Sequence, residues 1–198
     1  MQRGSLIKKS LNFNEESDLT DTGVLCVRSG DHKGRSPNGK YIVRDSETDK
    51  TVDWSANQEM SQSSWNALMG SVQTYIEAHS EYGREFFNIK RTAGKATRWV
   101  NRTRKTFNFI CENPTQALFI KNMFGECDQT AANDIEAEVY CLPGLAKEPK
   151  VVLNLKEKKI IIAGTKYLGE IKKSVFTYMN YVLTDSSVLP MHCSVNTD

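Results

Sequence analysis

The sequence predicts an α/β fold with α+β character, in which a mixed β-sheet is flanked by about three helices. Three observations lead to this prediction. Short apolar runs bounded by turn residues occur among amphipathic stretches of helical period. One pair of apolar runs is separated only by a polar turn, which indicates a hairpin. No Gly-, Ser- or Pro-rich linker divides the 198 residues, so we expect one domain over 21–198 after a polar N-terminal arm over 1–20.

The predicted strands are short apolar or alternating runs that end at turn residues. Between Ile135 and Cys141 apolar and polar residues alternate, which is typical of a half-buried strand. The polar turn at 156–158 separates the two strands of the expected hairpin. In chain order the predicted strands are 23–28, 40–45, 86–89, 107–111, 135–141, 151–155, 159–163 and 188–193.

Three amphipathic stretches predict the helices. The first follows Ser61, whose hydroxyl suits an N-cap. The second begins at Asn113 and Pro114, because Asn is a favoured cap and Pro is favoured at the first helical position. The third has its apolar residues between Ile171 and Leu183. The arm at 1–20 shows neither period, so we expect no regular structure there.

Composition excludes several classes of protein. Hydrophobic residues make up 39% and charged residues 25%, which rules out collagen-like, mucin-like and wholly disordered chains. The net charge of +2 produces no overall field that would attract nucleic acid or an anionic membrane. Any preference for an anion must therefore come from local clustering of charge.

The cysteines and apolar runs indicate the compartment. The five cysteines are far apart and include no CxxC pair, which argues against a disulfide framework or a cysteine zinc site. The start lacks an apolar segment of signal-peptide length, and the longest strongly apolar run, 160–163, is too short to span a bilayer. We therefore expect a reduced, cytoplasmic protein with no membrane partner.

Positive charge is concentrated at the start of the third predicted helix. Lys172 and Lys173 lie in its first turn, although cations are mildly unfavourable at the positive end of a helix dipole. Donors and lysines at such a place suit a phosphate, a carboxylate or a developing enolate, and they lower the pKa of a lysine toward use as a base or metal ligand. Alternatively, both lysines point to water and Glu170 offsets their charge.

Two other segments contain candidate residues. The loop at 29–39 places Arg35 among glycines, where its guanidinium could hold a carboxylate; the alternative is a basic surface loop. His192 follows an apolar run, a common place for a ligand or acid–base group, although a lone His is more often structural. No GxxxxGK[ST] phosphate loop occurs anywhere in the chain.

The segment 90–105 is strongly basic and contains Trp99, a combination that could suit single-stranded nucleic acid. Acidic residues elsewhere nearly cancel this charge, and no nucleic-acid motif accompanies it. We expect a solvated basic face and no nucleic-acid partner.

Several stretches, in order, resemble ATP-dependent phosphoenolpyruvate carboxykinases. The run GRSP at 34–37, followed by KYIVRD at 40–45, resembles the substrate loop of that family. FIKNMF at 119–124 is similar to its mid-domain helix. The most diagnostic stretch is GTKYLGEIKKSVF at 164–176, and LPMHCS at 189–194 continues the match. The resemblance implies the fold of the family's N-terminal, substrate-side domain.

The resemblance also implies a reaction and residue roles. Family members convert oxaloacetate and ATP to phosphoenolpyruvate, carbon dioxide and ADP in gluconeogenesis, using Mn²⁺ and Mg²⁺ with ATP. By resemblance, Arg35 would hold a carboxylate of oxaloacetate and Tyr167 would lie against the substrate. Lys172 would add positive charge for the enolate. Lys173 would face the enolate and ligate Mn²⁺ as a neutral amine. His192 would be the second metal ligand, and Lys173 and His192 would lie near the nucleotide.

The sequence also departs from the family pattern. The family's phosphate loop and metal-binding aspartates, which follow the His-Cys-Ser segment, have no counterpart here, and Leu168 replaces a small residue. We therefore expect a chain that supplies the oxaloacetate and metal side and is inactive alone. ATP would bind only if a nucleotide-binding half were supplied. The alternative is a degenerate, non-catalytic binding or regulatory module with a protein partner.

Overall fold

The structure, a computed structural model, describes residues 2–13, 17–94, 103–128 and 131–193. Its fold is α/β, as predicted, with a mixed seven-stranded sheet in the order β4-β3-β8-β9-β7-β6-β5. The strands of this sheet are β3 (Lys40–Val43), β4 (Gln58–Met60), β5 (Phe87–Ala93), β6 (Lys105–Cys111), β7 (Ile135–Leu142), β8 (Lys150–Asn154) and β9 (Lys159–Ala163). The described helices are α1 (Arg3–Phe13), α2 (Thr48–Thr51), α3 (Gln62–Glu81), α5 (Pro114–Met123) and α6 (Gly169–Thr184).

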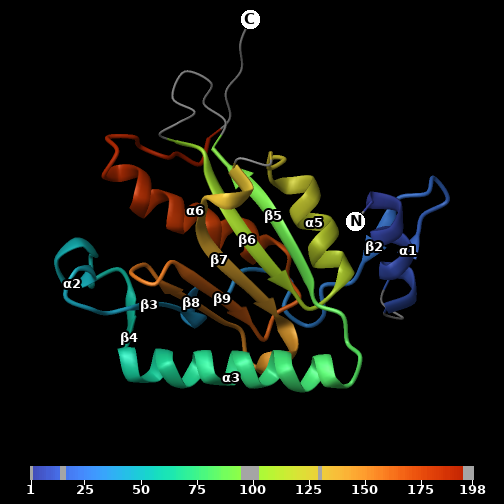
Figure 1. Cartoon of the computed structure of the whole chain (residues 1–198), viewed down its shortest axis with the longest axis horizontal. Coiled ribbons are helices and arrows are strands. Elements are labelled where there is room, and N and C mark those ends of the chain that lie inside the picture. The colour runs from blue at the N-terminus through green and yellow to red at the C-terminus, as the bar shows by residue number, and fades with distance from the viewer. Residues whose placement is uncertain (1, 14–16, 95–102, 129–130, 194–198) are drawn as a thin grey trace, which may run out of the picture.

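Helices cover both faces of the sheet. Figure 1 shows α3 along one side and α5 and α6 on the other. Successive residues of the central strands alternate between these two layers, as the strand period requires. In β9, Ile161 packs in the cluster that contains Trp65 of α3, whereas its neighbours Ile160 and Ile162 pack in the cluster that contains Ile171 of α6.

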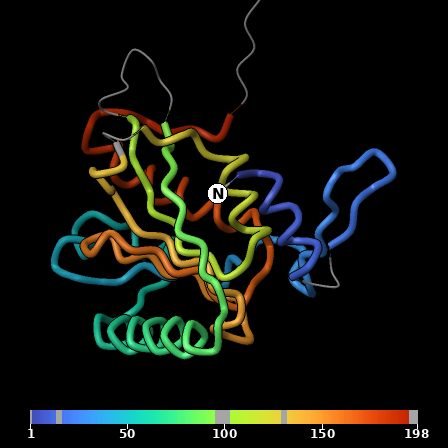
Figure 2. Tube along the Cα trace, turned by 45° about the vertical axis from the view of Figure 1, so that its right-hand side comes forward, coloured from blue at the N-terminus to red at the C-terminus, as the bar shows by residue number. Residues whose placement is uncertain are grey.

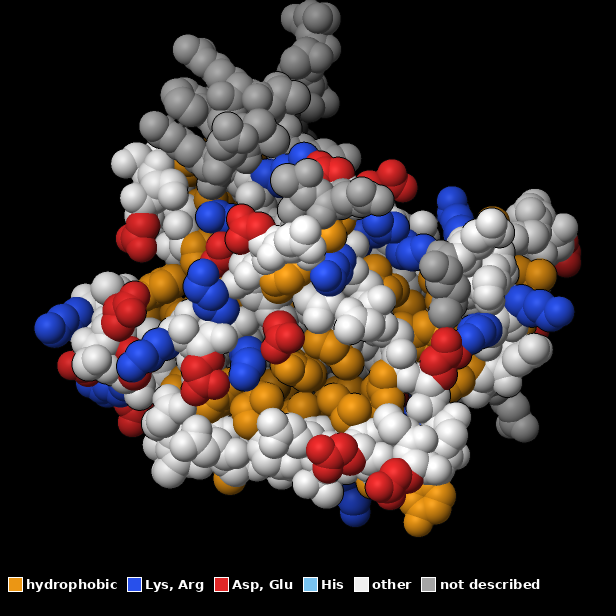
Figure 3. Space-filling view, viewed as in Figure 1, with side chains coloured by type: hydrophobic (Ala, Val, Ile, Leu, Met, Phe, Trp, Pro, Cys, Tyr) orange, Lys and Arg blue, Asp and Glu red, His pale blue; other side chains and the backbone are white. Residues whose placement is uncertain are grey.

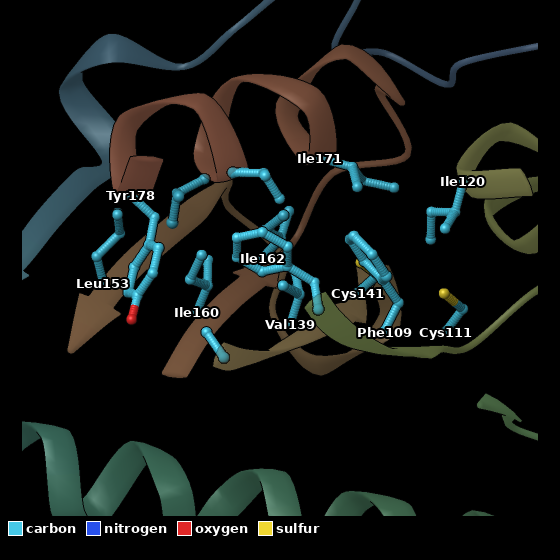
Figure 4. Close-up of a cluster of buried hydrophobic side chains, with 14 of the residues drawn as sticks. Phe109, Cys111, Ile120, Val139, Cys141, Leu153, Ile160, Ile162, Ile171 and Tyr178 are labelled. Atoms are coloured by element: carbon cyan, nitrogen blue, oxygen red, sulfur yellow. The ribbon is translucent and has the colours of Figure 1, made fainter. Parts of the chain in front are cut away.

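The larger core lies between the sheet and α5 and α6. Ile171 and Tyr178 extend from α6 toward Ile160 and Ile162 (Figure 4). These side chains are at most 2% exposed, and full burial of an aliphatic side chain of this size contributes about 1.5–3 kcal/mol. The core therefore fixes α6 on the sheet, and with it the position of the basic first turn of α6.

Strand direction brings two distant segments to the same end of the sheet. The antiparallel register of β8 and β9 pairs Lys150 with Ala163, so β8 begins where β9 ends. The parallel register of β3 and β8 pairs Lys40 with Val151, so β3 begins there as well. The loop before β3 and the connection from β9 to α6 therefore meet at this edge.

Several local predictions are confirmed. Ser61 caps α3 by accepting a hydrogen bond from the backbone N–H of Ser64. Asn113 and Gln116 form a capping box at the start of α5, and Pro114 occupies the first turn. The turn at 156–158 joins β8 and β9 in the expected antiparallel hairpin.

The N-terminal segment differs from its prediction. Residues 1–20 were expected to lack regular structure, but they contain α1 and the short strand β1 (Ser17–Leu19). Leu6 of α1 is fully buried in the same core cluster as α5. The sequence shows no helical period of apolar residues here, because only Leu6 and Ser10 of α1 are buried and Ser10 is polar. The Ser10 hydroxyl donates a hydrogen bond to the Leu6 carbonyl oxygen.

The segment at 188–193 is not the strand that was predicted. The N–H of Val188 donates to the carbonyl of Leu183, so the chain turns at the end of α6. Pro190 has no N–H to offer a strand ladder, and Leu189 and Met191 are 77% and 67% exposed. Leu189 and Met191 therefore face solvent, whereas Val188 is partly buried against the larger core cluster.

The strand predicted at 23–28 is confirmed, but it lies outside the main sheet. The run at 23–28 forms β2 (Leu25–Val27), which pairs with β1 in a separate two-stranded ribbon. This ribbon stands out from the main body (Figure 2). The elements β4 and α2 had no sequence signal, and a single 3₁₀ turn, Pro37–Gly39, precedes β3.

The surface carries charges of both signs, as the small net charge of the sequence implies. On the face in Figure 3, basic and acidic side chains are interspersed, and apolar side chains gather over the strands beside α3. Within the described part of the chain, no helix is long and apolar enough to cross a membrane. Of the basic segment 90–105, residues 95–102, including Trp99, lie outside the described residues.

Candidate functional site

The connection from β9 to α6 is shaped by two glycines. Gly164 has a φ of +68°, and a Cβ there would lie 2.0 Å from the carbonyl oxygen of Glu148. At Gly169, the first residue of α6, a Cβ would lie 2.5 Å from the ring of Tyr167. Gly164 requires glycine because the obstructing atoms belong to the backbone and its φ is positive, whereas a Cβ at Gly169 would require the Tyr167 ring to move. The GTKYLG sequence thus forms a tight turn that leads into the helix.

A buried carboxylate joins the loop before β3 to this helix. Glu170, in the first turn of α6, is 5% exposed, and its Oε1 accepts a hydrogen bond of 2.8 Å from the backbone N–H of Ser36. Ser36 follows Arg35 directly. The bond therefore fixes the position of the Arg35 backbone relative to the start of α6, across 134 residues of sequence.

A pocket of about 640 Å³ lies between the loop and the helix. Its walls contain three cationic side chains and one carboxylate, with polar and aromatic groups between them. The lining residues are Arg35, Ser36, Pro37, Lys40, Ala56, Asn57, Glu170, Lys173, Phe176, Thr177 and Asn180. Excess positive charge in a concave site favours an anionic ligand.

Lys173 lies between other cations and an aromatic ring. Partial removal from water, together with the positive charges of Arg35 and Lys172, lowers the pKa of Lys173 below its ordinary value. Its Nζ lies 5.3 Å from the centre of the Phe176 ring. A lysine with a lowered pKa is more readily neutral, which is the form that can act as a base or as a metal ligand.

His192 approaches the same aromatic ring. Its imidazole meets Phe176 edge-on, with ring centroids 6.1 Å apart. Phe176 therefore contacts both residues that the resemblance assigns to metal binding, although His192 itself is exposed and does not line the pocket. Two nitrogen ligands fit part of a metal site. Within the described chain there is no cluster of three or more His, Cys, Asp or Glu residues able to hold a metal ion.

The remaining site residues lie beside the pocket. Lys172 is exposed and is not part of the lining, although its charge acts on Lys173. Tyr167 packs over Gly169 and is half-buried, outside the lining. Leu168, the departure from the family pattern, packs against the main core cluster. Its larger side chain is thus accommodated by the core.

Comparison with known proteins assigns this arrangement to a family. The family model for phosphoenolpyruvate carboxykinase matches residues 1–198. The chain belongs to the phosphoenolpyruvate carboxykinase family. It is 35% identical to the phosphoenolpyruvate carboxykinase (ATP) of Fusobacterium nucleatum over 98% of its own length, and 34% identical to that of Geobacillus kaustophilus over 96%. The enzyme of Afipia carboxidovorans is 34% identical over 92% of this chain.

The chain spans only part of these carboxykinases. The matched region is 37% of the Fusobacterium and Geobacillus enzymes and 34% of the Afipia enzyme. The family membership and the α/β fold therefore agree with the resemblance to the N-terminal domain. The activity of the whole carboxykinase is a matter for proposal.

The structure adds pocket residues that the sequence did not single out as site residues. Lys40 appeared only as the first residue of the run KYIVRD at 40–45, and Glu170 only as a charge that offsets the lysines. Both residues stand in or beside the runs GRSP and GEIKK that resemble the family. The contact between these two runs, however, depends on the strand register and cannot be seen in either run alone. Phe176 carried no signal beyond its spacing of three residues from Lys173.

Proposed function

We propose that this chain supplies the oxaloacetate and metal side of an ATP-dependent phosphoenolpyruvate carboxykinase, a carboxy-lyase of gluconeogenesis. The observation that supports this most is that Arg35 and Lys173, which are 138 positions apart in the printed sequence, line the same pocket. The bond between Ser36 and Glu170 keeps their two segments together. Family membership supplies the class of reaction.

In this proposal Arg35 binds a carboxylate of oxaloacetate through its planar guanidinium. Tyr167, in the connection from β9 to α6, lies against the substrate. Loss of carbon dioxide leaves an enolate, whose negative charge is stabilised by the positive charge of Lys172 at the positive end of α6, and Lys173 faces the enolate oxygen. These residues act by binding and electrostatic stabilisation.

The metal and nucleotide parts of the proposal rest on fewer residues. Lys173, as a neutral amine, and His192 would hold Mn²⁺, and the metal would polarise the substrate oxygen. Nitrogen ligands suit Mn²⁺ better than Mg²⁺, which would accompany ATP. Lys173 and His192 would also lie near the nucleotide, which we expect to bind only when a nucleotide-binding half is supplied. The free cysteines support a reducing, cytoplasmic location.

Calorimetric titration with oxalate in the presence of Mn²⁺ tests the proposal. We expect saturable binding by the wild-type chain, loss of most of that binding in Arg35→Ala, and little change in Arg28→Ala. Arg28 is an exposed arginine outside the pocket, so it controls for the loss of one positive charge. Absence of binding by the wild type, or equal binding by Arg35→Ala, would contradict the proposal.

A further inference from the structure

Lys40 is held in the pocket by the same helix that carries Lys173. Lys40 is the first residue of β3, and its Nζ donates a hydrogen bond of 2.6 Å to Thr177 Oγ1. The Thr177 hydroxyl donates in turn to the carbonyl oxygen of Lys173, at 3.0 Å. Thr177 therefore acts as an acceptor toward Lys40, and the ammonium group has a defined position on α6.

The charge of Lys40 is only partly compensated within the protein. None of the ion pairs within 4.0 Å among the described residues includes Lys40. Burial is the main reason that the pKa of Lys40 is lowered, Glu170 opposes the change, and Arg35 adds to it. An ammonium has three N–H donors, of which one is used by Thr177. The others are available to a ligand in the pocket.

Arg35 lies within electrostatic reach of both lysines. Its positive charge lowers the pKa of Lys40 and also that of Lys173, although these lysines come from different elements. The charged lining residues are Arg35, Lys40, Lys173 and Glu170, which gives the wall of the pocket a net charge of +2. A ligand with two negative charges neutralises this wall, whereas a ligand with one leaves a partly desolvated cation without an anionic partner.

We propose that Lys40 binds the second carboxylate of a dicarboxylate in this pocket and thereby selects dicarboxylates over monocarboxylates. This inference rests on the proposed function, and it adds a specificity-determining residue to that site. Arg35, from the loop, and Lys40, from β3, each bind one carboxylate, since both line the pocket and the charge of Arg35 acts on Lys40. The selection arises because a monocarboxylate would leave the partly desolvated ammonium of Lys40 without an anionic partner.

The experiment compares two acids that differ by one carboxylate. Malate and 2-hydroxybutyrate share a carbon skeleton, except that a methyl group replaces the second carboxylate. We would titrate the ¹⁵N-labelled 198-residue chain with each acid, without metal, and follow amide chemical shifts, which also report whether each variant is folded. The variants are Lys40→Met, Thr177→Val and, as a matched control for charge, Lys50→Met on the exposed surface of α2.

We expect Lys40→Met to weaken malate binding on the order of tenfold and to change 2-hydroxybutyrate binding by less than about twofold. Thr177→Val should weaken malate binding by a smaller factor, since the ammonium remains but loses its anchor. Lys50→Met should leave both affinities unchanged. This pattern is specific to recognition of the second carboxylate, because a structural defect would weaken the two acids equally.

Two different failures are distinguishable. If the wild type binds malate but Lys40→Met binds it equally well, or loses both acids equally, the role of Lys40 is refuted while the proposed function stands. If the wild type binds neither malate nor oxalate, the proposed function fails, and the inference fails with it.

Discussion

The buried carboxylate of Glu170 should control the position of the loop that carries Arg35. Glu170→Ala removes the acceptor of the Ser36 N–H at the junction of the loop and α6. A hydrogen bond to a charged acceptor contributes roughly 1.5–3 kcal/mol, and Ser36 is only half-buried, so water replaces part of it. We expect a loss of about 1–2 kcal/mol in the free energy of unfolding. For a chain of this length that corresponds to a Tm lower by about 2–8 °C.

The local effect is more diagnostic than the change in Tm. Amide hydrogen exchange at Ser36, measured by NMR, should become roughly 5–30 times faster in Glu170→Ala, because the bond that protects this amide is gone. Glu170→Gln keeps an acceptor oxygen and should retain part of the protection. Glu81→Ala removes the same side chain from an exposed position of α3 and serves as the control. Unchanged exchange at Ser36 in Glu170→Ala would show that the loop is positioned by other contacts.

The remaining predictions concern the metal, its pH dependence, the N-terminal helix and turnover. Lys173→Met should abolish most Mn²⁺ binding, measured by electron paramagnetic resonance, with little change in Tm. A large drop in Tm would instead show a structural lysine. Since neutral Lys173 is the binding form, Mn²⁺ affinity should rise with pH. Lys172→Met should move this rise to higher pH, because the charge of Lys172 lowers the pKa of Lys173; an unmoved profile would exclude the coupling. Leu6→Ala should cost about 2–5 kcal/mol, against almost nothing for the exposed Ser5→Ala, and equal stabilities would contradict the burial of α1. Finally, the chain with oxaloacetate and ATP should release no ADP coupled to phosphoenolpyruvate, and stoichiometric ADP would refute an incomplete site.

Local sequence signals were sufficient where the neighbouring residues decide the structure. The caps at Ser61 and Asn113 act on backbone groups within three residues, so the starts of α3 and α5 could be predicted. The alternation along β7 and the turn between β8 and β9 are equally local. The start of α6 and its two lysines were visible for the same reason.

Elements whose burial depends on a distant partner could not be predicted. Leu6 is buried because α5 lies against α1, and no pattern within α1 itself shows that contact. Conversely, the apolar residues Leu189 and Met191 suggested a strand, but no described strand pairs with them, and both side chains are exposed. A strand forms only when a partner is available for its backbone groups.

By itself, the sequence determined the α/β class, most of the strands and long helices, and, through resemblance, the family and the two runs that contain Arg35 and Lys173. Only the tertiary structure decided that these runs share a pocket, that Glu170 holds them together through Ser36, and that Lys40 joins them. The physical reason is the register of the sheet. The start of β3 and the end of β9 meet because β8 lies between them, parallel to one and antiparallel to the other, and no local pattern in either run contains that information.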